Sequence, residues 1–286
     1  MSSPPTLDSL RREIDAIDDQ IHGLLIRRTE IVERIAAFKT GDNTFLRPAR
    51  EAMILRRLAA RHRGRFPLPV LVRIWREMIA AFCRIQGPFA IAVTAPTDTR
   101  GLWDVARDHY GSATPITAMP SAMQALRAVA AGRASVAVVP LPDDIAEGED
   151  PWWRALVSGD PTTPRIVDRL PILAAAGGEG ERGALGVARL RPEPTGDDHA
   201  YLVVELAEDM SRGRLKDHLD AAGLPPVAFW SRERRPQDET TPVLLEIADF
   251  VAEDDARLGD LADRLGSAAQ RIVVIGAYAL PVRDAA

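Results

Sequence analysis

The feature that most constrains this chain is a long apolar seam close to its N-terminus. Apolar side chains recur there at alternating three- and four-residue spacings over more than four heptads, at Leu7, Leu10, Ile14, Ile17, Ile21, Leu24, Ile31, Ile35 and Phe38. This period is that of an α-helix with one apolar stripe. The pattern therefore predicts a single long helix, ending before the turn-forming residues 40–44.

Two shorter helices are expected to follow. The second begins near Pro48, a residue suited to a first helical position, and fades before Gly64. The third runs from about Pro69 to Gln86, with Gly87-Pro88 as its stop. Residues 1–87 are thus predicted to form an all-α domain of three helices. A helix as long as the first is hard to cover with two shorter partners, which favours a dimeric bundle.

A charged side chain interrupts the seam. Arg28 stands where the heptad series expects a leucine, and an unpaired cation inside a bundle needs an anionic partner. A salt bridge to another helix is one reading, and an anionic ligand is the other. Lys39 lies roughly 16 Å along the axis from Arg28, within reach of a small ligand. Arg11 lies roughly 25 Å away in the other direction, so it could join such a site only from another copy.

The rest of the chain has a different pattern of apolar residues. Residues 88–195 alternate strand-like and helix-like segments, which predicts an α/β lobe with a parallel sheet. Residues 196–286 read strand, helix, strand, strand, helix, strand, the order of an α+β ferredoxin-like domain. A multidomain chain with boundaries at 87/88 and 195/196 is expected, in keeping with its 286 residues.

Composition narrows the functional classes. No apolar run is long enough to span a bilayer, no secretory signal pattern is present, and Cys83 is the single cysteine, so a cytoplasmic protein without a membrane role is expected. Residues 1–87 hold 16 Lys and Arg against 10 Asp and Glu, whereas the remainder is acidic. This asymmetry suggests an anionic ligand for the first domain. Nucleic acid is disfavoured, because aromatic residues make up only 5% of the chain.

The residues of the first domain resemble a known family. The segments that carry the resemblance are Leu10-Arg11, Leu24-Leu25, Arg27-Arg28, Lys39, Arg47-Pro48-Ala49-Arg50-Glu51 and Ile85-Gln86. Together they are similar to the AroQ-type chorismate mutases, all-α homodimers. One departure from the family is Phe82, where a small hydroxyl residue is common.

The resemblance implies a site and a reaction. Arg28 and Arg50, with Arg11 from the partner subunit, would bind the two carboxylates of chorismate. Lys39 and Gln86 would donate to the ether oxygen, and Glu51 would accept from the ring hydroxyl. The implied reaction is the Claisen rearrangement of chorismate to prephenate, which needs no cofactor, no metal and no nucleophile.

The remaining two-thirds resemble two modules of aromatic biosynthesis. Residues 88–190 are similar to the opening lobe of prephenate dehydratase, and residues 200–286 to the ACT regulatory domain. The dehydratase chemistry is missing, since Pro140-Leu141-Pro142-Asp143 and Gly186-Val187-Ala188-Arg189 replace the family's catalytic motifs. The expectation is a mutase without dehydratase activity. Two alternatives stay open, a non-catalytic regulatory or partner-binding protein of the same pathway and an isochorismate pyruvate-lyase-like enzyme.

Overall fold

The computed structural model describes residues 5–38, 45–95, 100–145, 151–158, 160, 162–174, 183–231 and 239–283. The three predicted N-terminal helices are present as α1 (Leu7–Ala37), α2 (Pro48–Arg61) and α3 (Leu68–Gln86). Thr6 caps α1, because its hydroxyl accepts from the Ser9 backbone N–H while the Ser9 hydroxyl accepts from that of Thr6.

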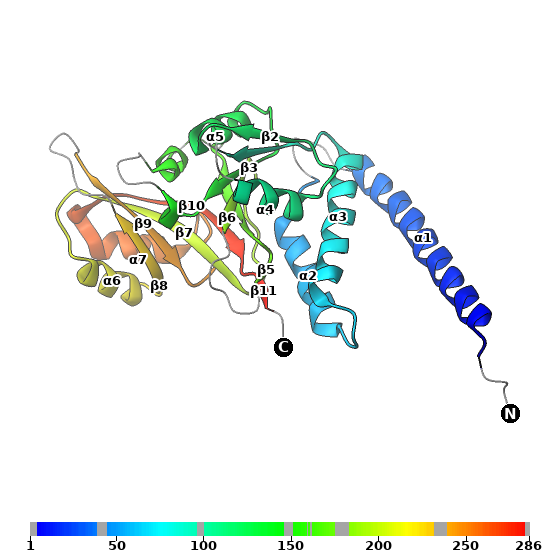
Figure 1. Ribbon diagram of the computed structural model, residues 1–286. Helices are drawn as coiled ribbons and strands as arrows, with labels where there is room; N and C mark the ends of the chain where they lie inside the picture. Colours follow the sequence, from blue (N-terminus) through cyan, green and yellow to red (C-terminus); the bar gives the residue numbers. More distant parts are fainter. Residues whose placement is uncertain are drawn as a thin grey trace.

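Helix α1 projects away from the body of the molecule (Figure 1). None of its 31 residues is buried, and the seam leucines and isoleucines face solvent, with Leu24 65% exposed. Its contacts with the rest of the described chain are made mainly with α3. One copy of the chain therefore leaves the apolar stripe of α1 uncovered. No helix in the described ranges is both long and apolar enough to cross a membrane.

The middle of the chain forms the predicted βαβαβ unit. Its elements are β1 (Ile91–Thr94), α4 (Arg100–Tyr110), β2 (Ile116–Met119), α5 (Ala122–Ala130) and β3 (Val136–Pro140). Strand β1 pairs in parallel with β2 and β3. Ile91 and Val93 pack into the core on the α4 side, whereas Ala92 packs on the α5 side, so this sheet carries a helix on each face.

The lobe is mixed rather than wholly parallel. Strand β6 (Ala184–Ala188) runs antiparallel to both β3 and β4 (Arg165–Leu170). No α-helix is described between β4 and β6, and a helical crossover is what a parallel connection normally requires. Two short 3₁₀ helices, η1 (Pro142–Asp144) and η2 (Trp152–Leu156), follow β3, and η2 buries Trp152 and Trp153 in the core.

The C-terminal part has the predicted ferredoxin-like order. Its elements are β7 (Asp198–Leu206), α6 (Arg212–Ala221), β8 (Pro226–Ser231), β9 (Thr241–Ile247), α7 (Ala256–Leu265), η3 (Gly266–Ala268) and β10 (Ala269–Ala279). The strands lie in the order β10-β7-β9-β8, with every neighbouring pair antiparallel. Helices α6 and α7 cover one face. A small two-stranded sheet, β5 (Leu173–Ala174) with β11 (Val282–Arg283), completes the fold.

The sheet of the middle lobe and the sheet of the C-terminal part join into one sheet of nine strands. The junction is a parallel contact between β4 and β10 at a single residue pair, Ile166 and Gly276. Gly276 has φ near +150°, and a Cβ atom there would lie 2.2 Å from the carbonyl oxygen of Ile166. Only glycine lets the two backbones approach this closely.

We predict that Gly276→Ala lowers the free energy of unfolding by roughly 2–4 kcal/mol, because the added methyl group forces β10 away from β4. Chemical denaturation of both proteins measures the loss. Gly259→Ala in α7 is the matched control, since no atom lies within 4 Å of the new methyl group. The control should be neutral or stabilising, and equal stability of Gly276→Ala and wild type would contradict the close approach.

Candidate functional site

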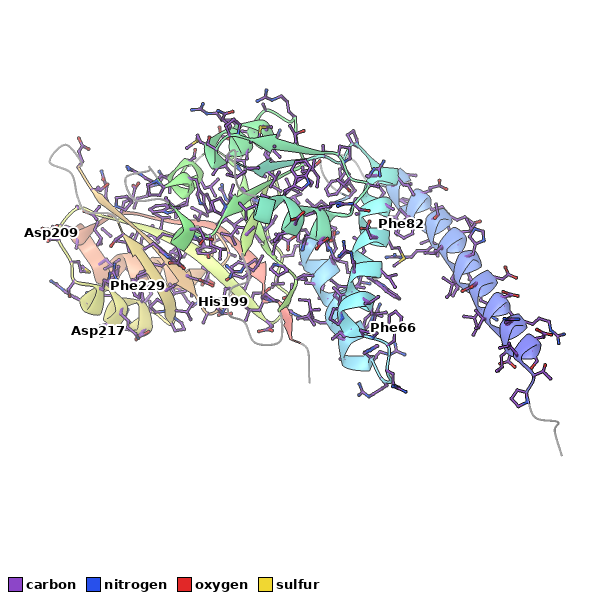
Figure 2. The ribbon with its side chains drawn as sticks, in the orientation of Figure 1. Phe66, Phe82, His199, Asp209, Asp217 and Phe229 are labelled. Carbon is purple, nitrogen blue, oxygen red and sulfur yellow. The ribbon has the colours of Figure 1, made fainter. Side chains whose placement is uncertain are left out.

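Arg28 lies where α1 meets α3. Its guanidinium carbon stands 4.5 Å from the centroid of the Phe82 ring, a cation–π contact between the two helices. Figure 2 labels Phe82 on α3. The Nη1 atom is shielded from solvent and has no hydrogen-bond partner among the described residues. Burial lowers the pKa of Arg28. The seam cation predicted from sequence is thus partly desolvated and lacks an acceptor in the described part of the chain.

Gln86 lies one turn beyond Phe82 on α3. Its Nε2 donates to the Phe82 carbonyl oxygen at 3.0 Å, and the side chain is half-buried. Phe82 therefore links the two predicted residues, because Arg28 stacks on its ring and Gln86 bonds to its backbone. Phe82, where the resemblance leads us to expect a small hydroxyl residue, places an aromatic ring at this point.

Two other predicted cations, Arg50 and Arg11, are exposed to solvent. Arg50 is exposed in the first turn of α2. Arg11 is exposed near the start of α1 and pairs with Asp8 at 3.4 Å. Along a helix axis Arg11 stands roughly 25 Å from Arg28, too far for both to touch one small ligand. Lys39 lies outside the described residues.

Glu51 is held by a partner that the sequence analysis missed. Its carboxylate accepts a hydrogen bond from the Arg76 Nη1 at 2.6 Å. The Glu51 side chain is only 8% exposed and the Arg76 side chain only 4%. The Arg76 Nε also donates to the His109 carbonyl oxygen at 2.5 Å. Burial alone would lower the pKa of Arg76, but the negative charges of Glu51 and Asp168 raise it. The predicted acceptor for a ring hydroxyl is therefore occupied within the chain.

The buried network continues into the α/β lobe. His109 Nε2 lies 2.8 Å from the Asp168 carboxylate, to which the Tyr110 hydroxyl also donates at 3.3 Å. Burial and the nearby positive charge of Arg76 lower the pKa of His109, so its imidazole is neutral and donates through Nε2. Burial would raise the pKa of Asp168, but His109 and Arg76 lower it below its usual value. The network fastens α2 and α3 to α4 and β4.

The burial of Arg76 could have been predicted from its position in the sequence. It falls between Val72, Ile79 and Cys83 at helical spacing, which puts a cation on the buried face of α3. Within the described residues, no group of three or more His, Cys, Asp or Glu side chains is arranged to hold a metal ion.

Residues 10–87 match the family model described as chorismate mutase type II. The helical segment is a chorismate mutase type II domain. A curated relative, the bifunctional chorismate mutase/prephenate dehydratase of Pseudomonas aeruginosa, is 29% identical over 147 residues, which cover 49% of this chain and 40% of the relative. That match is longer than the mutase domain, so homology extends beyond it. The chain spans about two-fifths of this relative's length.

Solved structures similar to the chain include GqqA, described as a novel type of quorum quenching acylase, and the prephenate dehydratase of Arthrobacter aurescens in complex with L-Phe. Both have a TM-score of 0.48 and cover 66% of this chain. GqqA is 14% identical with 94% of its chain covered, and the dehydratase 16% identical with 90% covered.

We predict that Glu51→Gln destabilises the chain by roughly 3–5 kcal/mol, because the neutral amide leaves the Arg76 cation buried without a counter-charge. Thermal and urea unfolding measure the loss. Arg73→Ala is the control, since Arg73 forms an exposed ion pair with Asp108, worth about 0–1 kcal/mol. Unchanged stability with impaired turnover would instead place the Glu51 carboxylate in the reaction.

Proposed function

We propose that this protein is a chorismate mutase, an isomerase that converts chorismate to prephenate by a cofactor-free Claisen rearrangement. The observation that carries the proposal is Arg28, a partly desolvated cation without an acceptor among the described residues, inside the segment that matches the mutase family. A partly desolvated cation of this kind is stabilised by an anionic ligand. Chorismate is a dianion.

The proposed chemistry rests on positioning and charge. Arg28 and Arg50, with Arg11 from a second copy, bind the two substrate carboxylates and hold the reactive conformer. Lys39 and Gln86 place hydrogen-bond donors at the ether oxygen, which becomes negative in the transition state. Glu51 is the predicted acceptor for the ring hydroxyl, and it can serve only when the ion pair with Arg76 opens or is shared.

The site is proposed to be completed by homodimerisation through α1. The helix is roughly 46 Å long, and its whole apolar stripe faces solvent in one copy of the chain. A second α1 would cover that stripe as in a coiled coil. It would also bring its own Arg11 to the region of Arg28, which the first copy's Arg11 cannot reach.

We also propose that the middle lobe has no dehydratase activity. Pro140-Leu141-Pro142 closes β3 and begins η1, where the family resemblance expects polar catalytic residues. Gly186 on β6 faces the Tyr110 hydroxyl, and a Cβ atom there would lie 2.4 Å from it. A threonine side chain would not fit at this position.

The buried Glu51–Arg76 pair favours one alternative, a non-catalytic regulatory or partner-binding protein that keeps the mutase fold. In that case the helices bind aromatic-pathway molecules or proteins without turnover. The discriminating measurement is the fate of chorismate.

We predict that the purified protein consumes chorismate and accumulates prephenate without phenylpyruvate. Arg28→Met should lower kcat/KM by roughly a hundredfold or more, because it removes a charged contact to the substrate carboxylate. Arg27→Met is the matched control, since the same charge is lost from an exposed neighbour and activity should persist. Lys39→Ala should abolish turnover.

If the wild type consumes no chorismate, the non-catalytic alternative remains. Formation of phenylpyruvate would contradict the proposal that the middle lobe has no dehydratase activity.

We predict that Ile17→Asp turns the dimer into a monomer, since it places a charge in the seam. Analytical ultracentrifugation across a dilution series measures the mass. Ile26→Asp is the matched control, because Ile26 is as exposed, at 51% against 53%, but lies off the heptad seam. A monomeric wild type, or equal dissociation of both variants, would contradict pairing through α1.

A further inference from the structure

A groove opens at the junction of the two sheets, and no described residue of α1, α2 or α3 lines it. It consists of two adjoining cavities of about 300 and 160 Å³ that share Arg165, Arg191 and Glu253 in their walls. Four separate segments line it: residues 162–165, 189–192, 250–254 and 274–276. The groove lies beside the pair Ile166 and Gly276, where β4 joins β10. Ligand sites are often clefts between two structural units.

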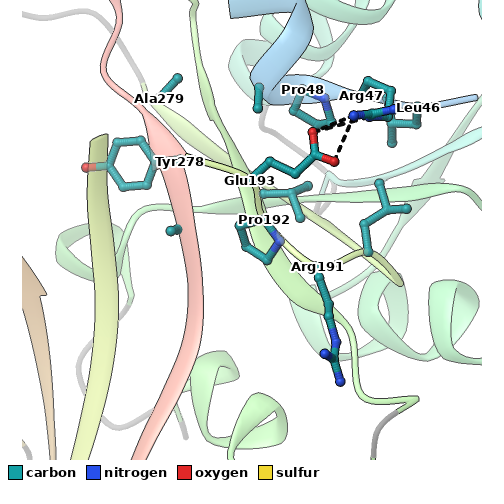
Figure 3. A pocket seen from close by; sticks show the side chains of 12 residues that line it. Leu46, Arg47, Pro48, Arg191, Pro192, Glu193, Tyr278 and Ala279 are labelled. Carbon is teal, nitrogen blue, oxygen red and sulfur yellow. Dashed lines mark hydrogen bonds and ion pairs between the residues drawn. The ribbon is translucent and has the colours of Figure 1, made fainter. Parts of the chain in front are cut away.

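Two guanidinium groups in this groove have no partner among the residues that the structure describes. Arg165 is fixed, since its Nε donates to Glu253 at 2.7 Å and its Nη1 to the Thr163 carbonyl oxygen at 3.0 Å. Arg189, half-buried, and Arg191, exposed, make no hydrogen bond or ion pair with any described residue. Figure 3 shows the Arg191 side chain directed away from the Arg47–Glu193 ion pair nearby. The groove thus offers two unoccupied forked donors.

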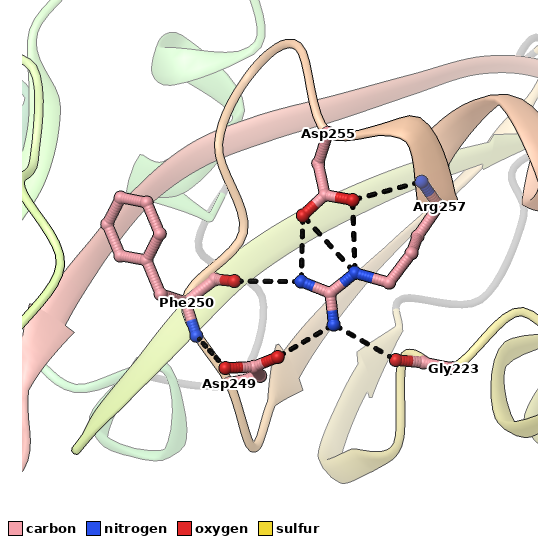
Figure 4. A network of polar contacts seen from close by, with 5 residues as sticks. All are labelled: Gly223, Asp249, Phe250, Asp255 and Arg257. Atoms are coloured by element: carbon pink, nitrogen blue, oxygen red, sulfur yellow. Dashed lines mark hydrogen bonds and ion pairs between the residues drawn. The ribbon is translucent and has the colours of Figure 1, made fainter. Parts of the chain in front are cut away.

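Another part of the groove wall is apolar. Phe250, Val251 and Val274 line it. The loop that carries Phe250 is clamped by Arg257, whose guanidinium donates to the Phe250 carbonyl oxygen at 2.9 Å and to the carboxylates of Asp249 and Asp255 at 2.7 Å (Figure 4). These carboxylates raise the pKa of Arg257. The wall is therefore held in place without a ligand.

We propose that this groove binds a small organic monocarboxylate with an apolar body. The carboxylate would accept from Arg189 and Arg191, which match its geometry as forks. The apolar body would lie along Phe250, Val251 and Val274. One side of the groove carries Glu253 and the exposed Asp254, so a dianion is disfavoured and a single negative charge fits better. The inference is independent of the mutase proposal.

The test is isothermal titration of the full-length protein with 3-phenylpropanoate. We expect saturable binding that weakens at least roughly tenfold in Arg189→Gln and in Arg191→Gln, since each removes a charged hydrogen bond. Arg127→Gln, an exposed position on α5, should bind as the wild type does. Arg28→Met should also bind as the wild type does, which separates this groove from the mutase site.

Two further ligands test whether both the carboxylate and the apolar body are needed for binding. 3-Phenylpropanol, which keeps the ring and lacks the carboxylate, should not bind, and inorganic sulfate should not displace the probe at matched concentration. Binding of the alcohol would make the groove a purely apolar pocket, and displacement by sulfate would make it a general anion site. Either result overturns the proposal, as does absence of 3-phenylpropanoate binding or full binding by Arg189→Gln.

Discussion

The arrangement of this molecule depends on one buried cation. Arg76 is enclosed where α2, α3 and α4 meet, and it bonds both to the carboxylate of Glu51 and to the backbone of α4. Burying a guanidinium is costly unless every neighbour complements it, so this contact fixes how the mutase helices sit on the α/β lobe. His109, Tyr110 and Asp168 extend the same network to β4. The lobe is therefore part of the support of the helical domain and more than a spacer.

That support brings a conflict at the site. Glu51 is a predicted substrate contact, yet its carboxylate neutralises the cation that holds the helices in place. Arg50, the residue directly before Glu51, faces solvent instead. Successive residues of α2 thus divide between holding the fold and remaining available to a ligand. Arg28 and Gln86, both in contact with Phe82, are the predicted residues that the described chain brings together.

Much of this fold could be predicted from the sequence because its signals are local. Local patterns within each segment predict the long helix α1, the end of α3 after Gln86, and the order of strands and helices in both later domains. The antiparallel β6, the Glu51–Arg76 pair and the merged sheet depend on contacts between distant segments. Gly276 is instructive, since a glycine inside a strand marks a close approach, but nothing nearby in the sequence identifies Ile166 as its neighbour. Lys39 lies outside the described residues, so its predicted role stays a prediction.

The uncovered stripe of α1 has a consequence for the lifetime of the protein in a cell. Backbone hydrogen bonds of an isolated helix open easily, and proteases cut segments that open. Under the proposed pairing through α1, chains that have not met a second copy would expose α1 to cleavage, whereas the central strands of the nine-stranded sheet are buried. A cut beyond Arg28 would remove that residue from the chain, so under this proposal the number of complete chains would rise more steeply than the rate of synthesis.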